Sequence, residues 1–461
     1  MSGISYMSMS VSREGNGDPV TADLLYSETE RDLTAALADL LTDRAAPADV
    51  IARTERPEAY DIKLWRTLAA EIGIAGLLIP EALGGAGASY RELAAAAEQF
   101  GAFVAPIPYL GSAAVATAAL LSAARSAAAA DGTGSTARAP GGLDTGDPGG
   151  FGSASSGPAA VLRAAQLRAA ARAPQGADAA SGTRAASVSP AAGLLRQLAD
   201  GSLTATLAVT AAVRPATPFP ALARVVGRGE AAGTVKLRGA IPAVADALPA
   251  DVLLVPADGV PNALYLVEAA APGVHRTPLV SLDMTRQLCD ITLDDAPARQ
   301  VAVGAAAAAA VTAGLAAGAA ILAAEQLGLA QRCLDLTVAY VQERRQFARQ
   351  IGSFQAVKHR LADLWTTITL ARAASRYAAA CLADSDPDAP VAVALAKSAC
   401  CEAAVTAAQE CVQLHGGIGF TWEHPAQLYL KRAKAASLAF GTPGAHRAAL
   451  ATLVNLPAPD A

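Results

Sequence analysis

The fold is decided by two segments near the C-terminus, Glu343-Arg-Arg-Gln-Phe-Ala-Arg-Gln-Ile-Gly-Ser-Phe-Gln355 and Gln413-Leu-His-Gly-Gly-Ile-Gly-Phe420. The planar arginines of the first segment can bind a pyrophosphate through paired hydrogen bonds. Its glutamines can bind an amide or adenine edge. The paired glycines of the second let a backbone approach a large ligand closely. Each feature also has a plainer interpretation, because Arg344 sits in a charge run and the glycines could simply end a helix.

Around these segments the sequence predicts long helices joined by short loops. The expected helices cover 305–348, 354–383, 389–414, 425–439 and a last stretch from Pro443. Such a pattern is typical of an antiparallel four-helix bundle, here residues 304–457. One stretch, Val301 to Ala324, has no charge and is long enough to span a bilayer. Its apolar content is mostly alanine and glycine, so a buried helix without membrane insertion is expected.

Upstream of the bundle the hydrophobic period changes. Short β-branched runs separated by Gly, Pro and Asp predict a small β barrel or antiparallel sheet over residues 191–303. Residues 27–123 have helical spacing and form an N-terminal helical domain, with Ser89 and Glu92 spaced as a capping box. The expected fold class is therefore α+β multidomain. Two segments are expected to lie outside the domains: a disordered tail over 1–26, and a low-complexity insertion over 124–190 with one short helix at 159–173.

Composition excludes several classes of protein. The net charge is −5, so no basic field favours nucleic acid. The six cysteines have no CxxC spacing and the five histidines no HxxxH, so neither a disulfide scaffold nor a metal site is expected. The polar N-terminus is not a secretory signal. A cytoplasmic location is expected on these grounds.

The two bundle segments, the stretch from Gly73 to Gly87 (GIAGLLIPEALGGAG) and the domain order together resemble the acyl-CoA dehydrogenase family over nearly the whole chain. The resemblance implies an FAD-dependent oxidoreductase of lipid catabolism. Such an enzyme removes the α and β hydrogens of an acyl-CoA thioester and passes electrons to an electron-transfer flavoprotein or a similar acceptor. It also implies a tetramer, made of like or unlike subunits.

The resemblance also carries roles for particular residues. Arg344 and Phe347 match positions that contact the FAD of a neighbouring subunit, and Gln355 a position near the adenine. Gln413, Gly416 and Gly417 match the segment that receives the same cofactor across the subunit interface. Thr442 matches a threonine that contacts the FAD phosphates, and Thr210 matches the barrel threonine that faces the flavin. On the residues alone, Phe347 could be core and Gln413 a polar cap.

The position of the catalytic base departs from the family pattern. The reaction needs a carboxylate above the substrate α-carbon. Phe440 occupies the usual place of this glutamate, and the alternative place on an earlier helix falls near Gly318. The catalytic base is therefore unknown, with Glu423 and Glu325 as weak candidates whose plainer interpretation is a cap or an ion pair.

The flavin bed departs as well. The Trp-Ile-Thr strand of the family corresponds to about Ala243–Ala245, and its Thr-Glu-Pro loop to Thr210-Ala-Ala-Val-Arg-Pro. This combination favours a supporting subunit of a hetero-oligomer with a base-bearing partner. Two alternatives stay open: a self-sufficient homotetrameric dehydrogenase with an unconventional base, and a non-redox binding or scaffold protein on the same fold.

Overall fold

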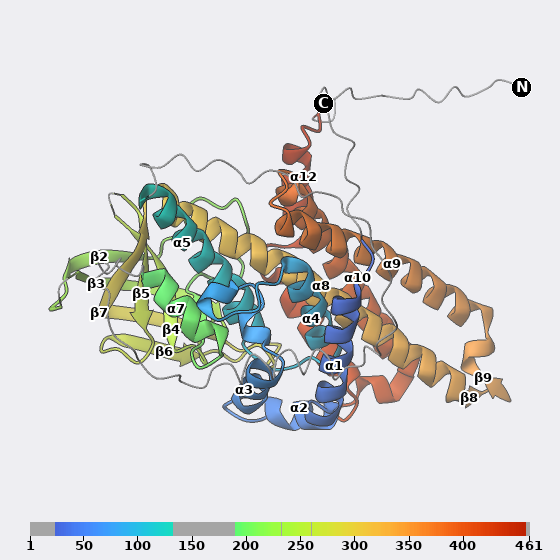
Figure 1. Cartoon of the computed structure of the whole chain (residues 1–461). Coiled ribbons are helices and arrows are strands. Elements are labelled where there is room, and N and C mark those ends of the chain that lie inside the picture. The colour runs from blue at the N-terminus through green and yellow to red at the C-terminus, as the bar shows by residue number, and fades with distance from the viewer. Residues whose placement is uncertain (1–23, 132–189, 232, 260, 458–461) are drawn as a thin grey trace, which may run out of the picture.

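The computed structural model describes residues 24–131, 190–231, 233–259 and 261–457. Figure 1 shows its three parts: a β domain at the left, the N-terminal helices in the lower middle, and a bundle of long helices extending to the right. Helix α8 (Ala305–Glu343) runs through all of them, from the β domain to the far end of the bundle. The expected order of helical region, β domain and helical bundle is confirmed.

The N-terminal helices begin where side chains can cap them. Ser27 and Ser89 each accept a hydrogen bond from a backbone amide of the first turn. The carboxylates of Glu30 and Glu92 accept in return from the backbone amides of Ser27 and Ser89, so both helices begin with a capping box. The elements are α1 (Glu28–Arg44), α2 (Pro47–Thr54), α3 (Ile62–Glu71), η1 (Ile74–Gly76), η2 (Glu81–Leu83), α4 (Tyr90–Ala102), η3 (Leu110–Ala116), α5 (Thr117–Asp131) and α7 (Pro190–Ala199).

Two of these helices differ from the expected boundaries. Helix α5 continues to Asp131, although a low-complexity insertion was expected from residue 124. Helix α7 falls in the range expected to open the β domain, yet it packs against α5, η1 and η2. The β domain therefore begins only at Ala205. The helix expected at 159–173 lies outside the described residues.

The middle domain is a barrel. Its strands are β1 (Ala205–Leu207), β2 (Ala223–Arg228), β3 (Thr234–Ala245), β4 (Val252–Asp258), β5 (Ala263–Glu268), β6 (Val274–Pro278) and β7 (Leu288–Val303). The order β4-β2-β3-β7-β5 returns to β4 and closes the sheet, with β1 on β4 and β6 on β7. It is not wholly antiparallel, because β1 and β2 both pair with β4 in parallel. Alternating apolar residues of these strands fill the interior.

The bundle consists of α8, α9 (Gln355–Ala383), α10 (Ala389–His415), α11 (Ala426–Leu438) and α12 (Pro443–Leu453). The hairpin β8–β9 (Arg345–Gln346 and Arg349–Gln350) and η4 (Ile351–Ser353) join α8 to α9, and η5 (Gly416–Phe420) follows α10. Three helical stretches, at 110–129, 305–343 and 389–420, are long and apolar enough to cross a membrane. In the fold, more than half of each such window is buried against other helices.

A buried carboxyl group lies in the helical core. Glu98 of α4 is 8% exposed and accepts hydrogen bonds from the Tyr26 hydroxyl at 2.8 and 2.7 Å. Burial raises its pKa to about 7, although the hydrogen bond from Tyr26 acts in the opposite direction. The folded protein therefore holds a proton here that the unfolded chain has already lost, and stability falls as pH rises from about 4.5 to 7.

We expect Glu98→Gln to remove this fall. Glutamine keeps an acceptor for Tyr26 but has no charge to bury. The variant should gain up to about 3 kcal/mol over the parent at pH 8, and far less at pH 5. Urea unfolding at the two pH values measures the difference, with the exposed Glu230→Gln as control. An equal gain at both pH values would show that ionisation of Glu98 plays no part.

Candidate functional site

The sequence-predicted site residues fall into two separate groups in the structure. The first group lies at the far end of the bundle, where the ring of Tyr340 in α8 stacks on His415 in α10 with centroids 4.4 Å apart. This contact brings the C-terminal ends of α8 and α10 together. The predicted residues at this end are Arg344, which ends α8, Phe347 in the hairpin that follows, Gln355, which begins α9, and Gln413, Gly416 and Gly417 at the end of α10.

Arg344 ends helix α8 and is exposed, with no ion-pair or side-chain hydrogen-bond partner among the described residues. The hairpin that follows turns sharply, with φ of 51° at Phe347 and 62° at Ala348. This turn leaves the Phe347 ring 86% exposed, while Arg349 stacks on Phe354 with its guanidinium carbon 3.8 Å from the ring centre. The hairpin thus holds one arginine over the ring of Phe354 and leaves the ring of Phe347 exposed.

The second segment of this group presents bare backbone. Gln413 is exposed on the last turn of α10, and Gly416 ends the helix with φ of 62°, a conformation that favours glycine. A Cβ added at Gly416 or Gly417 would meet nothing within 4 Å. The backbone of Gly416 and Gly417 is therefore accessible to a ligand beside Gln413. The end of the bundle, residues 343–355 and 413–420, has the cation, amide and open backbone that a nucleotide phosphate requires.

The second group gathers at the turn between α11 and α12. The amide of Phe440 donates to the carbonyl oxygen of Ala211 at 2.7 Å, which ties this turn to the loop that carries Thr210. Thr442 caps α12 by accepting from the Ala445 amide at 3.2 Å. Thr210 and Thr442 therefore lie at opposite ends of one short connection, near the β domain.

The two groups cannot serve one ligand within a single chain. Gly318, which packs on Phe440, and Arg344 are both on α8 or at its end, 26 positions apart in the chain. At 1.5 Å per residue they are separated by about 39 Å along the helix. A dinucleotide cannot span that distance. If both groups bind the same kind of cofactor, each must be completed by another subunit.

Phe440 stands where the family pattern expects a base. A Cβ added at Gly318 would lie 2.6 Å from the Phe440 ring and 2.9 Å from a methyl group of Val115. The two positions that the resemblance assigns to a base therefore face each other, and the aromatic ring fills the space between them. Phe440 is only 8% exposed, and its φ of 52° is in the left-handed region. Neither position carries a carboxylate.

Two cavities flank this turn. One, of about 590 Å³, lies between the β domain and the end of α11, and its lining includes Thr210, Ala243, Ser281 and Ala439. The other, of about 540 Å³, lies between α8, α10 and α12, and Arg214 and His446 are among its few polar residues. The loop 210–216 contributes to both linings. The turn and this loop thus form a partition between two mostly apolar cavities.

Glu325, one of the two weak candidates for a base, is fixed by two arginines. Arg286 donates to its oxygens at 3.2 and 2.5 Å, and Arg432 to one of them at 2.8 Å. Burial alone would raise the pKa of this carboxyl, but the two guanidinium groups outweigh it and lower the pKa to about 2. A group so stabilised as its anion is a poor proton acceptor, and both of its oxygens are already bonded.

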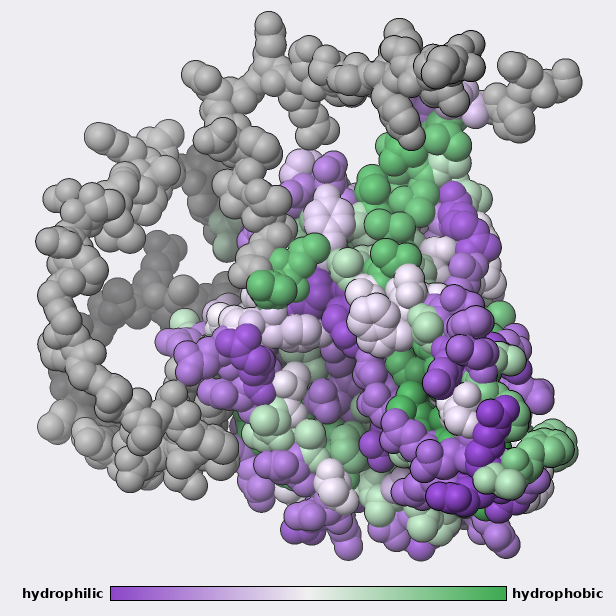
Figure 2. Space-filling model, turned by 90° about the vertical axis from the view of Figure 1, so that its right-hand side faces the viewer, coloured by the Kyte–Doolittle hydropathy of each residue, from purple (hydrophilic) through white to green (hydrophobic). Residues whose placement is uncertain are grey.

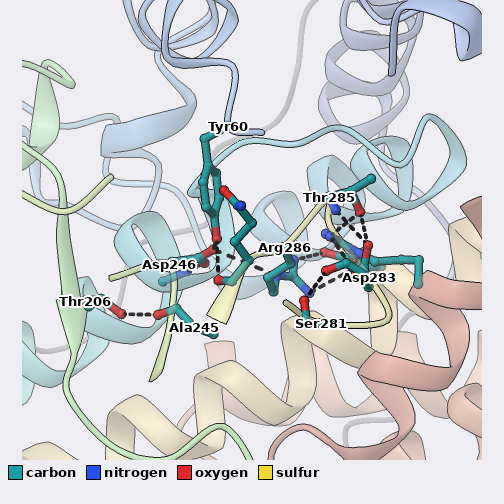
Figure 3. Close-up of polar contacts among 12 residues, drawn as sticks. Tyr60, Thr206, Ala245, Asp246, Ser281, Asp283, Thr285 and Arg286 are labelled. Atoms are coloured by element: carbon teal, nitrogen blue, oxygen red, sulfur yellow. Dashed lines mark hydrogen bonds and ion pairs between the residues drawn. The ribbon is translucent and has the colours of Figure 1, made fainter. Parts of the chain in front are cut away.

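The cluster around Glu325 joins all three parts of the fold. Arg286 comes from the β domain, and its Nε lies 4.0 Å from Asp246. Asp246 accepts from the Tyr60 hydroxyl of the N-terminal region at 2.6 Å, as Figure 3 shows. Arg432 of α11 also donates to Asp283 at 3.3 Å. The cluster is therefore an ionic junction between domains.

Glu423, the other weak candidate, lies on the exposed turn before α11. Phe440 follows the opposite end of that helix, which has 13 residues and is about 20 Å long. The structure therefore brings neither Glu325 nor Glu423 to the position that the resemblance assigns to the base.

Sequence reasoning did not single out the ionic junction or the buried lysine of α10. Both had a signal, namely a lone charge in a long apolar run: Glu325 within α8, and Lys397 as the single charged residue of 389–401. A charge in such a run must be paired or otherwise satisfied. Its partners, which come from distant strands and turns, have no signature of their own.

Comparison with known proteins adds the family context. Residues 27–129 match the family described as "Acyl-CoA dehydrogenase, N-terminal domain", and residues 308–454 match "Acyl-CoA dehydrogenase, C-terminal domain". The chain is 31% identical to "Acyl-CoA dehydrogenase IpdE2" of Mycobacterium tuberculosis over 88% of its own length and 91% of that protein.

Two solved structures are also similar. One is described as the ChsE4-ChsE5 complex from Mycobacterium tuberculosis (TM-score 0.70, 26% identity, 95% of this chain and 100% of that chain). The other is described as a variant of the Tcur3481-Tcur3483 steroid ACAD (TM-score 0.68, 27% identity, 93% of this chain and 98% of that chain).

Proposed function

Because the chain belongs to the acyl-CoA dehydrogenase family, whose members are oxidoreductases acting on CH–CH groups, we propose that it is a supporting subunit of a hetero-oligomer with a base-bearing partner. One observation carries this proposal: Phe440 and Gly318 fill both base positions without a carboxylate. The end of the bundle meanwhile keeps an exposed Arg344, which pairs with no side chain in the described part of the chain, and open glycines. On this proposal the chain lacks a base for the substrate proton, and it keeps the residues that would contact the cofactor of a neighbouring subunit.

The residues present fit FAD at two half-sites. At the bundle end, Arg344 would hold a pyrophosphate oxygen and Gln413 a polar edge of the partner's cofactor, with Phe347 against its rings. In the chain's own half-site, the cavity of about 590 Å³ has room for a ring system beside the Thr210 hydroxyl. FAD, when bound, supplies the acceptor for a hydride from the acyl chain. The residues of this chain bind and orient it, and none is placed to take the substrate proton.

The similar structures support assembly with an unlike partner. The description of one names a complex of two components, and that of the other names two components of a steroid ACAD. By extension we propose an acyl-CoA with a ring-containing acyl group as the substrate class to test first. The geometry does not support the self-sufficient alternative, because Glu325 accepts three hydrogen bonds from two arginines and Glu423 lies at the opposite end of α11 from Phe440.

The surface of the bundle also supports assembly. Figure 2 shows a strip of hydrophobic residues between hydrophilic ones on the face at the right of Figure 1. Large apolar side chains are exposed on α9 and α10, with Trp365 and Leu370 of α9 each more than half exposed. Such an apolar surface on a folded chain favours contact with another subunit.

The flavin absorbance of the purified chain tests the proposal. The chain is expressed alone, and then together with a base-bearing dehydrogenase subunit. Flavin retained by the mixture, bleached by an acyl-CoA and absent or inert in the single chain, is the expected result. Flavin in the single chain that an acyl-CoA bleaches would establish a self-sufficient enzyme. Colourless protein in both preparations would favour a non-redox role.

Removing the cation at the bundle end should weaken cofactor binding in the complex. Arg344→Met keeps the length of the side chain but loses charged hydrogen bonds worth about 1.5–3 kcal/mol. We expect an FAD dissociation constant about 10- to 100-fold higher, measured by titration of the apo-complex with fluorescence of the flavin. Arg345→Met is the matched control, because Arg345 is a likewise exposed arginine that begins strand β8, whereas Arg344 ends helix α8. Equal effects of both substitutions would argue against a specific contact by Arg344.

A further inference from the structure

The middle of α10 contains a buried ammonium group that pairs with no carboxylate among the described residues. The side chain of Lys397 is fully buried. Its Nζ donates to the Sγ of Cys401 at 3.0 Å, the carbonyl oxygen of Ala436 at 3.1 Å and that of Gly441 at 3.3 Å. An ammonium group has three donors and no acceptor. All three donors are therefore used, and two go to backbone outside α10.

These two carbonyl groups belong to the connection between α11 and α12. Ala436 lies in the last turn of α11, where carbonyl oxygens lack intrahelical partners and a positive charge is favoured. Gly441 lies in the turn itself, with φ of 94°. Lys397 of α10 thus binds one carbonyl group before Phe440 in the chain and one after it.

We propose that Lys397 is the positioning residue of the turn 439–442, holding residue 440 against Gly318 from the bundle side. Two further bonds act from other directions. Ala211 of the β domain accepts from the Phe440 amide at 2.7 Å, and His446 of α12 donates through Nε2 to the Phe440 carbonyl at 2.8 Å. The turn is thereby fixed from the bundle, the barrel and α12.

Packing alone does not account for a lysine here. A buried charge without an ionic partner costs several kcal/mol, and a methionine of similar length would fill the same space without that cost. The turn also holds Phe440 in the left-handed region, which is strained for any residue with a side chain. Strain of this kind persists only where the surroundings fix the backbone. The hydrogen bonds of Lys397 fix the backbone of the turn from α10, whereas Ala211 and His446 bind it from the β domain and from α12.

This inference rests on the proposed function only in taking position 440 as the place of the family's base. Its test needs neither flavin nor a partner. Hydrogen exchange by mass spectrometry is compared in the full chain, Lys397→Met and the control Lys434→Met, whose lysine is exposed on α11. We expect exchange at least tenfold faster in peptides covering 436–446 for Lys397→Met only, with peptides of α9 unchanged. If that variant fails to fold, Lys397→Gln, which keeps N–H donors without the charge, replaces it.

The pKa of His446 supplies a second readout. Burial lowers this pKa, the hydrogen bond to Phe440 raises it, and the charges of Lys397 and Arg214 lower it further. Loss of Lys397 should therefore raise the pKa, as measured by NMR titration against the four other histidines. Unchanged exchange at 436–446, or exchange raised equally over all bundle helices, would overturn the proposal. A failure here leaves the subunit role untouched, because that role is read from flavin occupancy.

Discussion

Replacing Glu325 by alanine is expected to lower the free energy of unfolding by about 3–5 kcal/mol. The substitution leaves Arg286 and Arg432 buried together without the carboxylate that both contact. Two like charges then stay close together in a buried site, with only Asp246 and Asp283 left as anions beside them. The ionic junction also binds Asp246 and Tyr60, so the loss should loosen the contact between all three parts of the fold.

Urea unfolding at pH 7 measures this effect, with Glu343→Ala, an exposed position on the same helix, as the matched control. The pH dependence is a second signature. The pKa of Glu325 is lowered to about 2 in the folded protein, so its contribution is present above about pH 4.5 and is lost as pH falls toward 2. The difference between parent and variant should shrink over that range.

A second substitution at this position separates two roles for Glu325. A catalytic base predicts that Glu325→Gln is folded and as stable as the parent but inactive. An ionic junction predicts a clear loss of stability even with this nearly isosteric change, because the neutral amide removes the one carboxylate that both buried arginines share and leaves only Asp246 and Asp283 beside them. A stable Glu325→Gln would therefore contradict the structural role argued from the contacts of Arg286 and Arg432.

The sequence predicted the parts of the fold that have local signals. The bundle helices were expected within a few residues of their bounds, except that α8 ends at Glu343 rather than 348, where the hairpin begins. Strand β2 has no local signal of this kind, because five of its six residues are exposed and no alternation of buried and exposed positions marks it. Closure of the barrel and its parallel pairs depend on distant partners, which periodicity cannot reveal.

The roles of the predicted site residues stay predictions, and the structure adds how these residues are arranged. The motif matches named Arg344, Gln413, Thr210 and Thr442. Only the fold shows that Arg344 and Gln413 lie at one end of the bundle, and that Thr210 and Thr442 lie far from them, near the β domain. The separation follows from the 39 residues of α8. Likewise, the sequence shows a phenylalanine at the position that the resemblance assigns to the base. The contact of Phe440 with Gly318 could not be predicted, because the two positions are 122 residues apart in the chain.

Introducing a carboxylate at position 440 should restore proton abstraction in this chain. The ring of Phe440 packs on Gly318, next to Ala439 of the lining of the 590 Å³ cavity, and a glutamate there would occupy part of the space of the ring. General bases typically contribute a factor of about 10²–10⁴ to the rate. We expect Phe440→Glu to exceed Phe440→Gln, its uncharged control of the same shape, by about that factor.

The partner must not contribute to the measured rate. Each variant is therefore assembled with a partner whose own base has been changed to glutamine, and bleaching of the flavin by acyl-CoA is followed in a single turnover. Flavin content per complex is measured alongside. Equal rates for the two variants, with flavin in this chain's cavity, would mean that residue 440 does not face the reacting carbon. Flavin confined to the partner's cavity would also contradict the expectation, since the loss of turnover would then lie in the altered bed of Ala243–Ala245 and not in the missing carboxylate.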